Sequence, residues 1–189
     1  MTSVAGLLLA AGQGSRLGRP KALVEIGGRR LADRAVGTLR EAGLAPIVVV
    51  SGAAPIDLPG VVVAHNPEWA TGMGSSLRTG LAALPDDAGA VVVSLVDQPG
   101  VGPEAVRRLA AAYEAGAEVA VATYDGEPRN PVLLARTHWP AVAESATGDR
   151  GARAFLRAHP DLVTPVECGD VAGADDIDTP ADLDRYTGD

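Results

Sequence analysis

A glycine-rich segment near the start of the chain has the residues needed to bind an anion. The stretch LLLAAGQGSRLGRPK ends at Lys21 and contains Gly12, Gly14 and Gly18. Glycine permits positive φ and lets the backbone approach a ligand closely, and successive N–H groups in such a turn form a concavity for phosphate oxygens. Because Arg16 and Lys21 add positive charge to the same segment, we predict a phosphate-binding loop here.

Lys21 is also unusual in its residue type. Of the 16 basic residues it is the single lysine, and the others are all arginine. Lysine offers a compact ammonium and arginine a planar fork, so the two are not interchangeable at a tight phosphate site. The alternative is a surface lysine that remains by chance, but we favour a functional ammonium.

The loop differs from two familiar nucleotide-binding loops. A P-loop ends in GKS or GKT after four spacer residues, whereas GRPK lacks both the spacing and the hydroxyl. A dinucleotide-binding loop opens a helix with G-x-G-x-x-G and has an acidic residue about 20 positions further on. Here the apolar piece ALVEIGG precedes the helix, and the second predicted strand is followed by Ser51. An NAD(P)-dependent oxidoreductase therefore remains an alternative that these mismatches disfavour.

A carboxylate follows the most β-rich run of the chain, AVVVSLV, at Asp97. In open parallel sheets the ligand lies beyond the carboxyl ends of the strands, so Asp97 and the glycine loop should share one edge. Magnesium binds one or two carboxylates and completes its shell with water and phosphate oxygens. We therefore predict that Asp97 is a Mg²⁺ ligand.

A second acidic cluster, DDIDTP, supplies Asp178 as the candidate second ligand. The same residue precedes Thr179 and Pro180, so it could equally cap the last helix. From the sequence, both roles remain open.

Other catalytic groups are weak candidates. The segment GMGSS does not match the G-x-S-x-G motif of hydrolases, and His65, His138 and His159 lack metal-ligand spacing. Cys168, the only cysteine, has no evident histidine partner and is expected to be a buried, inert thiol. A hydrolase is therefore disfavoured.

Composition narrows the class of protein further. The chain has 189 residues, 47% of them hydrophobic, and a net charge of −8, which predicts one globular domain over residues 1–189. The acidic balance argues against nucleic-acid or membrane partners. We expect no signal peptide and no membrane span, and a single cysteine fits a cytoplasmic protein.

The pattern alternates apolar runs with helical spacing. Strands are expected at 4–10, 46–50, 61–64, 90–96, 118–123, 131–134 and 162–167, and helices at 30–42, 75–84, 103–115, 152–158 and 179–186. The segment YDGEPRN is expected to be a turn-rich loop. Strands separated by crossover helices predict an α/β fold, a three-layer sandwich with a mostly parallel sheet between helices.

With these residues in view, the chain resembles a known family. The run LLLAAGQGSRLGRPKAL looks like the signature of the molybdopterin nucleotidyltransferases, and four further stretches look like the molybdenum cofactor cytidylyltransferase branch. These are NPEWATGMGSSLRTGL, VDQP, GDRGARAFL and DIDTPADL, so the resemblance extends from residue 7 to residue 183. It implies a Rossmann-like nucleotide-diphospho-sugar transferase fold and, with Mg²⁺, transfer of CMP from CTP to the phosphate of molybdenum-bound molybdopterin, with release of pyrophosphate.

The resemblance also implies roles for individual residues. Arg16, Lys21 and Asp97 would be catalytic, with Asp97 and Asp178 holding the metal. The nucleotide would contact Leu9, Ala10, Ala11, Gly12, Gly14, Ser15, Arg16, Lys21, Ser75 and Asp97. The second substrate would contact Asn66, Ser76 and the turn at Asn130 and Pro131. A molybdoenzyme that receives the product is an implied partner.

Nucleotide and acceptor choice are less constrained. Two alanines before the first loop glycine, Ala10 and Ala11, are typical of the cytidylyl branch, whereas Gly-Gly there is typical of the guanylyl branch. That branch usually has Gly-His-Pro where this chain has Asn130 before Pro131. Guanylyl transfer from GTP, transfer to a sugar phosphate or another phosphorylated metabolite, and a non-catalytic cofactor-holding protein are therefore alternatives.

Overall fold

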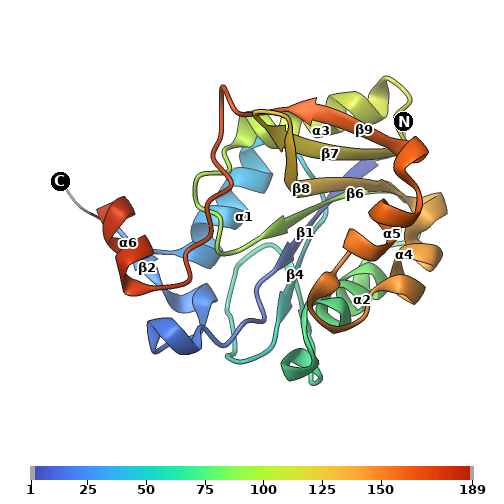
Figure 1. Ribbon diagram of the computed structural model, residues 1–189. Helices are drawn as coiled ribbons and strands as arrows, with labels where there is room; N and C mark the ends of the chain where they lie inside the picture. The colour runs from blue at the N-terminus through green and yellow to red at the C-terminus, as the bar shows by residue number, and fades with distance from the viewer. Residues whose placement is uncertain (1–2, 188–189) are drawn as a thin grey trace.

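A seven-stranded mixed sheet forms the centre of the computed structural model, which describes residues 3–187 (Figure 1). The strand order is β5-β4-β1-β6-β8-β7-β9, and β8 alone runs antiparallel to its neighbours. The strands are β1 (Ser3–Leu9), β4 (Ile47–Ser51), β5 (Val62–His65), β6 (Ala88–Leu95), β7 (Val119–Tyr124), β8 (Glu127–Ala135) and β9 (Val163–Glu167), and a separate hairpin joins β2 (Glu25–Ile26) to β3 (Arg29–Arg30).

Helices cover both faces of this sheet. They are α1 (Leu31–Glu41), α2 (Met73–Ala83), α3 (Pro103–Glu114), α4 (Trp139–Ser145), α5 (Arg153–Ala158) and α6 (Pro180–Thr187), with short 3₁₀ turns η1 (Ser15–Leu17), η2 (Lys21–Leu23), η3 (Trp69–Thr71), η4 (Arg136–His138), η5 (Gly148–Arg150) and η6 (Pro160–Leu162). Figure 1 shows α1 and α3 on one side of the sheet and α2, α4 and α5 on the other. The predicted three-layer α/β fold is confirmed.

Two apolar cores follow from this layering. Successive side chains of a strand point to opposite faces, so Leu8 packs with α1 and α3 while Leu7 packs with α2. Val49 and Val50 of β4 divide in the same way. A strand buried on both faces needs apolar residues at every position, which is why β1, β4 and β6 read as continuous apolar runs. These strands, α1 and α3 lie within two residues of their predicted bounds.

The segment predicted as a turn-rich loop is a correction. Asp125, with a φ of 51°, and Gly126, with a φ of 83°, turn β7 back into β8 as a hairpin, and residues 127–130 are already strand. Asn130 and Pro131 are therefore inside β8 and do not form a turn. They are joined by a cis peptide bond at a register shift between β7 and β8. Proline has no N–H to donate to a sheet, so an irregularity is where it fits.

Several short elements lack a prediction from the sequence, among them α4, η2 and the hairpin of β2 and β3. Residues 139–145 form α4, whose signal is the proline in its first turn, Pro140. The piece ALVEIGG forms η2 and the strand β2, which pairs with β3 only and brings the chain into α1. Within residues 3–187, no helix is long and apolar enough to cross a membrane.

Candidate active site

The glycine loop leaves β1 and turns at two glycines. Gly14 has a φ of 60° and Gly18 a φ of 74°, and they flank η1. A Cβ on Gly14 would lie 2.1 Å from the Arg19 carbonyl oxygen, so no other residue fits there. Gly12 does not adopt a positive φ, contrary to expectation; its carbonyl instead accepts a hydrogen bond from the Lys21 backbone N–H at 3.3 Å. This bond draws Lys21 back toward the start of the loop.

The Lys21 ammonium joins two carboxylates from distant parts of the chain. Its Nζ lies 2.5 Å from Asp97 Oδ2 and 2.5 Å from Asp178 Oδ1. The Lys21 and Asp97 side chains are 18% and 16% exposed, whereas that of Asp178 is 43% exposed. The sheet explains the first contact: β1 and β6 are parallel neighbours, and the Val96 N–H, just beyond β6, donates to the Leu9 carbonyl at the end of β1.

The electrostatics of this trio follow from burial and charge. Burial favours a neutral Lys21, but the charges of Asp97 and Asp178 and their hydrogen bonds outweigh it and raise the pKa of the ammonium. Burial also raises the pKa of the Asp97 carboxyl, and the neighbouring Lys21 offsets this only in part. Asp97 therefore carries its charge at a desolvation cost, and a further cation would relieve that cost.

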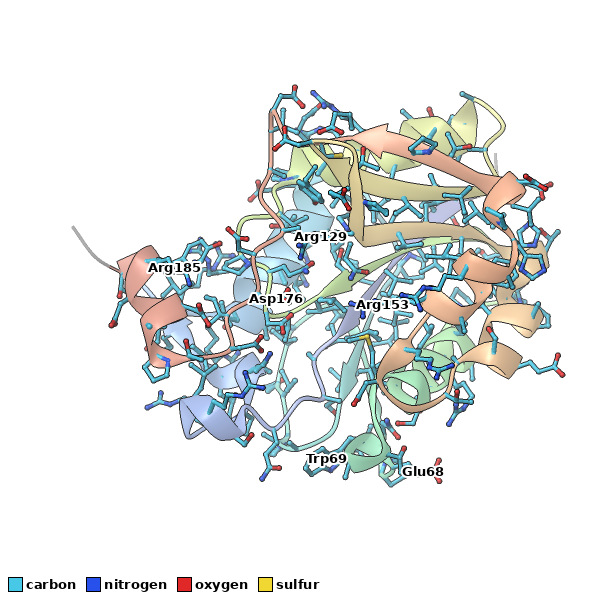
Figure 2. The ribbon with its side chains drawn as sticks, in the orientation of Figure 1. Glu68, Trp69, Arg129, Arg153, Asp176 and Arg185 are labelled. Carbon is cyan, nitrogen blue, oxygen red and sulfur yellow. The ribbon has the colours of Figure 1, made fainter. Side chains whose placement is uncertain are left out.

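A C-terminal segment, residues 169–179, carries Asp178 to the site, and we call it the strap. The Ile177 N–H donates to the Asp97 carbonyl at 2.8 Å, and the Gly173 N–H donates to the Gly100 carbonyl at 3.1 Å. Figure 2 shows Asp176 on this strap and Arg185 beyond it on α6. These backbone hydrogen bonds hold the strap against the loop that follows β6.

A buried glutamine ties the same two segments together. Gln98 Nε2 donates to Asp176 Oδ1 at 2.7 Å and to the Ala174 carbonyl at 3.3 Å. Gln98 follows Asp97 directly, and Asp176 lies two positions before Asp178. The pair therefore sets the spacing between the two carboxylates, a role that neither residue's position in the sequence indicates.

The helix-cap alternative for Asp178 is resolved by its neighbours. Asp182 Oδ2 accepts hydrogen bonds from the Thr179 N–H at 2.8 Å and the Thr179 hydroxyl at 2.8 Å, and Thr179 Oγ1 accepts from the Asp182 N–H at 3.3 Å. This reciprocal arrangement is a capping box. Thr179 and Asp182 cap α6, and the Asp178 carboxylate is left to contact Lys21.

The donor set suits a magnesium-type ion. Asp97 and Asp178 both contact one cation, the Lys21 ammonium, so their carboxylates already lie close enough together to bind a single positive charge. Within residues 3–187, no group of three or more His, Cys, Asp or Glu side chains could hold a metal. Magnesium takes one or two carboxylates from proteins and completes its shell with phosphate and water oxygens, so this pair fits it, whereas a structural zinc site would need four protein ligands.

The residues predicted to contact the second substrate form a buried network. Asn66 Nδ2 donates to Ser75 Oγ at 2.8 Å and to Ser76 Oγ at 3.0 Å, and the Glu68 N–H donates to Asn66 Oδ1 at 2.9 Å. Asn66, Ser75 and Ser76 are each less than 5% exposed. These side chains fasten the start of α2 to η3, and contact with a substrate stays a prediction.

The other predicted residues surround the trio unevenly. Leu9, Ala10 and Ala11 are buried where β1 ends, so they present backbone more than side chain. Ser15 and Arg16 are exposed on η1. Asn130 is half-buried, and its carbonyl accepts a hydrogen bond from the Tyr124 hydroxyl at 2.8 Å.

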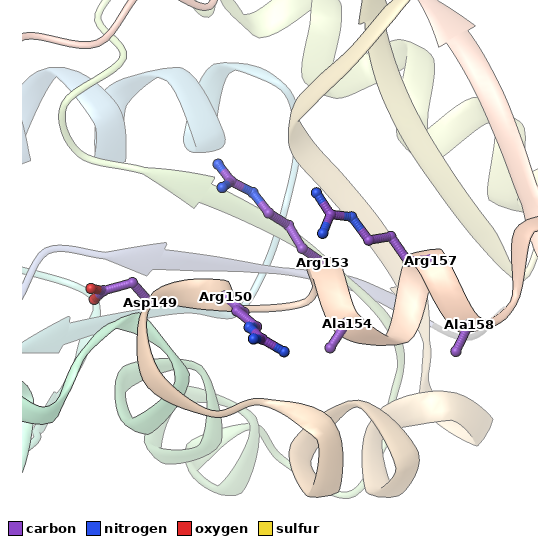
Figure 3. A pocket seen from close by; sticks show the side chains of 6 residues that line it. All are labelled: Asp149, Arg150, Arg153, Ala154, Arg157 and Ala158. Atoms are coloured by element: carbon purple, nitrogen blue, oxygen red, sulfur yellow. The ribbon is translucent and has the colours of Figure 1, made fainter.

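A basic pocket that sequence reasoning missed lies on η5 and α5. It has a volume of about 540 Å³ and is lined by Asp149, Arg150, Arg153, Ala154, Arg157 and Ala158. Figure 3 shows the Arg153 and Arg157 side chains extending from the same side of α5, with Arg150 pointing away from them. Among the described residues, no salt bridge pairs any of these arginines. In the sequence, the arginines of the segment GDRGARAFL are the feature that could have indicated this pocket.

Close backbone packing connects this pocket with the glycine loop. A Cβ on Gly52 would lie 2.7 Å from Ala11 Cβ and 2.5 Å from Trp69 Cβ, which joins the end of β1 to η3. A Cβ on Gly72 would lie 2.5 Å from the Gly148 carbonyl, which joins the end of η3 to η5. The glycine loop, η3 and η5 therefore form a continuous series of contacting segments that leads to the arginines.

Comparison with known proteins gives the chain a family. The model of the MobA-like NTP transferase domain matches residues 6–163. "Nicotine blue oxidoreductase" of Paenarthrobacter nicotinovorans is 39% identical over 190 residues, covering 93% of this chain and 92% of that protein. A short match, 47% identical over 49 residues, covers 26% of this chain and 24% of the "Probable molybdenum cofactor guanylyltransferase" of Opitutus terrae.

Solved structures agree with the fold. Rv0371c of Mycobacterium tuberculosis H37Rv superimposes with a TM-score of 0.84 and 28% identity, covering 100% of this chain and 99% of that one. A structure of Rv0371c in complex with manganese has a TM-score of 0.82 and 26% identity, covering 98% of each chain. The manganese complex is evidence for a divalent cation in that protein.

Proposed function

The chain belongs to the MobA-like NTP transferase family, and from that premise we propose that it transfers a cytidylyl group from CTP to the phosphate of molybdenum-bound molybdopterin, with Mg²⁺. Members of this family of nucleotidyltransferases bind nucleoside triphosphates and a phosphorylated acceptor. The observation that carries the proposal is the meeting of Lys21 with Asp97 and Asp178 beside the glycine loop. Positive charge and paired carboxylates at one sheet edge suit phosphoryl chemistry.

The proposed step is a substitution at the α-phosphorus of the nucleotide. An oxygen of the acceptor phosphate forms a bond to that phosphorus, the bond from it to the bridging oxygen of the β-phosphate breaks, and pyrophosphate leaves with the electron pair. Both reactants are anions, so positioning and charge stabilisation are what the protein must supply. This agrees with the lack of a nucleophile motif in the sequence.

Each part of the site has a share in this chemistry. The backbone around Gly14 and the Arg16 guanidinium would hold the phosphates, and the Lys21 ammonium would offset the negative charge near the reacting phosphorus. Asp97 and Asp178 would hold Mg²⁺, which supplies neutralisation of phosphate charge when bound. Ser75 and Ser76, through Asn66, would keep the start of α2 in place.

Support for CTP comes from the two alanines, Ala10 and Ala11, which stand where the guanylyl branch has glycines. Transfer from GTP, or to a sugar phosphate or another phosphorylated metabolite, stays an alternative because Asn130 precedes Pro131 where the cytidylyl branch has histidine. Arg153 and Arg157, which have no salt-bridge partner in the part of the chain that the structure describes, would provide a second binding position for the negatively charged group of the acceptor.

We place this activity in the cytoplasm and assign residues 1–189 to one nucleotidyltransferase domain. The buried Cys168 thiol fits a reducing compartment. A molybdoenzyme would receive the product. The net charge of −8 argues against nucleic acid and membrane as partners.

A second candidate function rests on the 39% identity to nicotine blue oxidoreductase over 93% of the chain. That likeness favours an oxidoreductase on the same scaffold, with an electron donor in place of the triphosphate. The Lys21, Asp97 and Asp178 trio would then serve structure and not turnover. A nucleotidyltransferase should bind nucleoside triphosphates, whereas an oxidoreductase should bind a nicotinamide dinucleotide.

One matrix of assays separates the candidates. The full chain is incubated at fixed Mg²⁺ with each of the four common nucleoside triphosphates and with molybdopterin cofactor or a panel of sugar phosphates, and pyrophosphate is measured. Calorimetry with NADH and NADPH runs beside it. Pyrophosphate release that is greatest with CTP and molybdopterin supports the proposal, and a greater rate with another acceptor redirects it. Binding of a nicotinamide dinucleotide without any pyrophosphate release sinks it in favour of the oxidoreductase.

A further inference from the structure

A second pocket lies behind the loop that carries Asp97. It has a volume of about 140 Å³ and is formed between α1 and residues 94–101 at the end of β6. Its lining includes Arg29, Arg34 and Glu41 from the α1 side. None of these residues contacts the Lys21 trio through any hydrogen bond described above, so this pocket is distinct from the candidate active site.

The pocket gathers polar atoms that lack partners. Among residues 3–187, the buried side-chain atoms with no hydrogen-bond partner are Arg34 Nε, Ser94 Oγ and Gln98 Oε1, and all three residues line this pocket. Ser94 is 8% exposed and Gln98 is 7% exposed. A buried polar atom left unpaired is costly, so their concentration around one space indicates that a polar ligand belongs there.

The orientation of the Gln98 amide is fixed by its other contacts. Its Nε2 already donates to the Asp176 carboxylate and the Ala174 carbonyl, so Oε1 must be the free atom and can only accept. Arg34 Nε can only donate, and the Ser94 hydroxyl can do either. The ligand must therefore both accept hydrogen bonds and donate at least one.

Charge narrows the ligand further. Arg29 and Arg34 bring two positive charges to the pocket and Glu41 one negative charge, which favours an anion. Glu41, like Gln98 Oε1, would accept a hydrogen bond donated by a protonated oxygen of that anion. We propose that this pocket binds a small oxyanion that retains a proton, of the hydrogen-phosphate class.

A ligand here would also bear on the catalytic edge. Gln98 lines the pocket with one end of its amide and holds the strap through Asp176 with the other. Occupancy would add a contact at Gln98 Oε1 to the two that Nε2 already makes, and so strengthen the link between the loop after β6 and the strap. The binding site itself stands independently of which reaction the enzyme catalyses.

The test uses inorganic phosphate and sulfate as probes on the full chain. Near neutral pH phosphate keeps a proton and sulfate does not, so the acceptors of Gln98 and Glu41 should discriminate between them. Each salt is titrated at constant ionic strength while the melting temperature is followed, since a ligand that binds the folded state raises it with a saturable dependence. We expect phosphate to bind at least tenfold more tightly than sulfate.

Four variants locate the site. Arg34→Gln should weaken phosphate binding by roughly tenfold or more, because a charged donor is lost, and Ser94→Ala should weaken it with little change to the surrounding surface. Arg185→Gln removes the same charge from an exposed side chain on α6 and should leave phosphate binding unchanged. Lys21→Gln removes a charge from the candidate active site, so the part of the phosphate response that depends on Arg34 should persist in it.

Three outcomes would overturn the proposal. If the melting temperature of the wild-type protein shows no saturable dependence on phosphate, the pocket binds only water. Equal affinity for sulfate and phosphate would remove the role of the two acceptors. Loss of the response in Lys21→Gln, with retention in both Arg34→Gln and Ser94→Ala, would assign phosphate to the candidate active site instead.

Discussion

Asp97 and Asp178 lie against a single ammonium nitrogen, Lys21 Nζ, each at 2.5 Å. One carboxylate follows a central strand and the other arrives on the strap from the end of the chain. Two like charges this close need a cation between them. In this structure the Lys21 ammonium is that cation. We propose that, when Lys21 contacts the triphosphate, a divalent ion also offsets the charge of the two carboxylates.

Replacing Lys21 by glutamine should separate turnover from metal binding. Pyrophosphate release should fall by roughly 10²–10³-fold, the usual scale for losing one charge-stabilising group. Manganese binding, followed by electron paramagnetic resonance, should be retained or tightened because both carboxylates lose their internal partner. Lys21→Arg should restore only part of the rate, since the fork differs in shape. Wild-type turnover in Lys21→Gln would remove this residue from the mechanism.

Neutralising either carboxylate should abolish metal-dependent turnover. We expect Asp97→Asn and Asp178→Asn each to lose about 10²-fold or more in rate, with Asp97→Asn retaining its fold because the buried charge there has a desolvation cost. The matched control is Asp175→Asn, an exposed member of the same acidic cluster that does not contact Lys21. Rates come from pyrophosphate release and folding from circular dichroism. Equal rates in all three variants would contradict the metal assignment.

Asp176 is expected to act by positioning the strap. Asp176→Ala removes the acceptor for Gln98 Nε2, so the Mg²⁺ concentration that gives half-maximal rate should rise severalfold while kcat at saturating Mg²⁺ changes less. Asp176→Asn keeps a carbonyl oxygen and should recover most of the wild-type Mg²⁺ dependence. If the asparagine variant behaves like the alanine variant, the charge of Asp176 matters and the positioning role is wrong.

Asn66 should matter to stability. Its buried amide serves Ser75, Ser76 and the Glu68 N–H, so Asn66→Ala leaves polar groups unpaired at a cost of about 1–3 kcal/mol in the free energy of unfolding. Urea denaturation measures this. Asn130→Ala, at a half-buried side chain in β8, should stay within about 0.5 kcal/mol of the wild-type value. A neutral Asn66→Ala would show that the network is dispensable.

The stability conferred by Glu167 should depend on pH. Its carboxylate accepts hydrogen bonds from the Thr123 hydroxyl at 2.8 Å, the Gly169 N–H at 2.9 Å, the Gly126 N–H at 3.2 Å and the Asp125 N–H at 3.0 Å. The Thr123 hydrogen bond, followed by those from the backbone, lowers the pKa of Glu167 below its ordinary value.

A group with a lowered pKa in the folded state stabilises the fold above its unfolded pKa and ceases to do so as the pH falls through the folded value. The difference in unfolding free energy between wild type and Glu167→Gln should therefore be largest near neutral pH. It should shrink as the pH falls below about 4.3, the ordinary pKa of glutamate. Urea melts at a series of pH values measure it, and a difference that is constant with pH would contradict the assignment.

Much of the scaffold could be predicted because its signals are local. Most residues of β1 and of β6, the strand before Asp97, are apolar because both strands are buried on both faces. The predicted meeting of Lys21 and Asp97 at one edge is confirmed by the 2.5 Å contact. That expectation needed only two parallel strands and the positions where they end.

The remaining features depend on long-range contacts that local patterns do not record. The sequence allowed Asp178 to be a cap or a site residue, and only the structure shows that Thr179 and Asp182 cap α6 while Asp178 contacts Lys21. Residues 127–130 read as a loop because proline and glycine favour turns, yet pairing with β7 extends the strand through them. Gln98 has no motif that marks it, since its importance comes from Asp176, far along the chain.

The strap sets a condition on when the site can exist. All seven strands of the central sheet precede Asp178 in the chain, because β9 ends at Glu167. A nascent chain thus contains the glycine loop while half of the acidic pair is still missing. In a molecule nicked at an exposed position such as Asp175, the sheet keeps its strands and Asp178 is held beside Lys21 by the hydrogen bonds of residues 176 and 177 without a covalent link to β9.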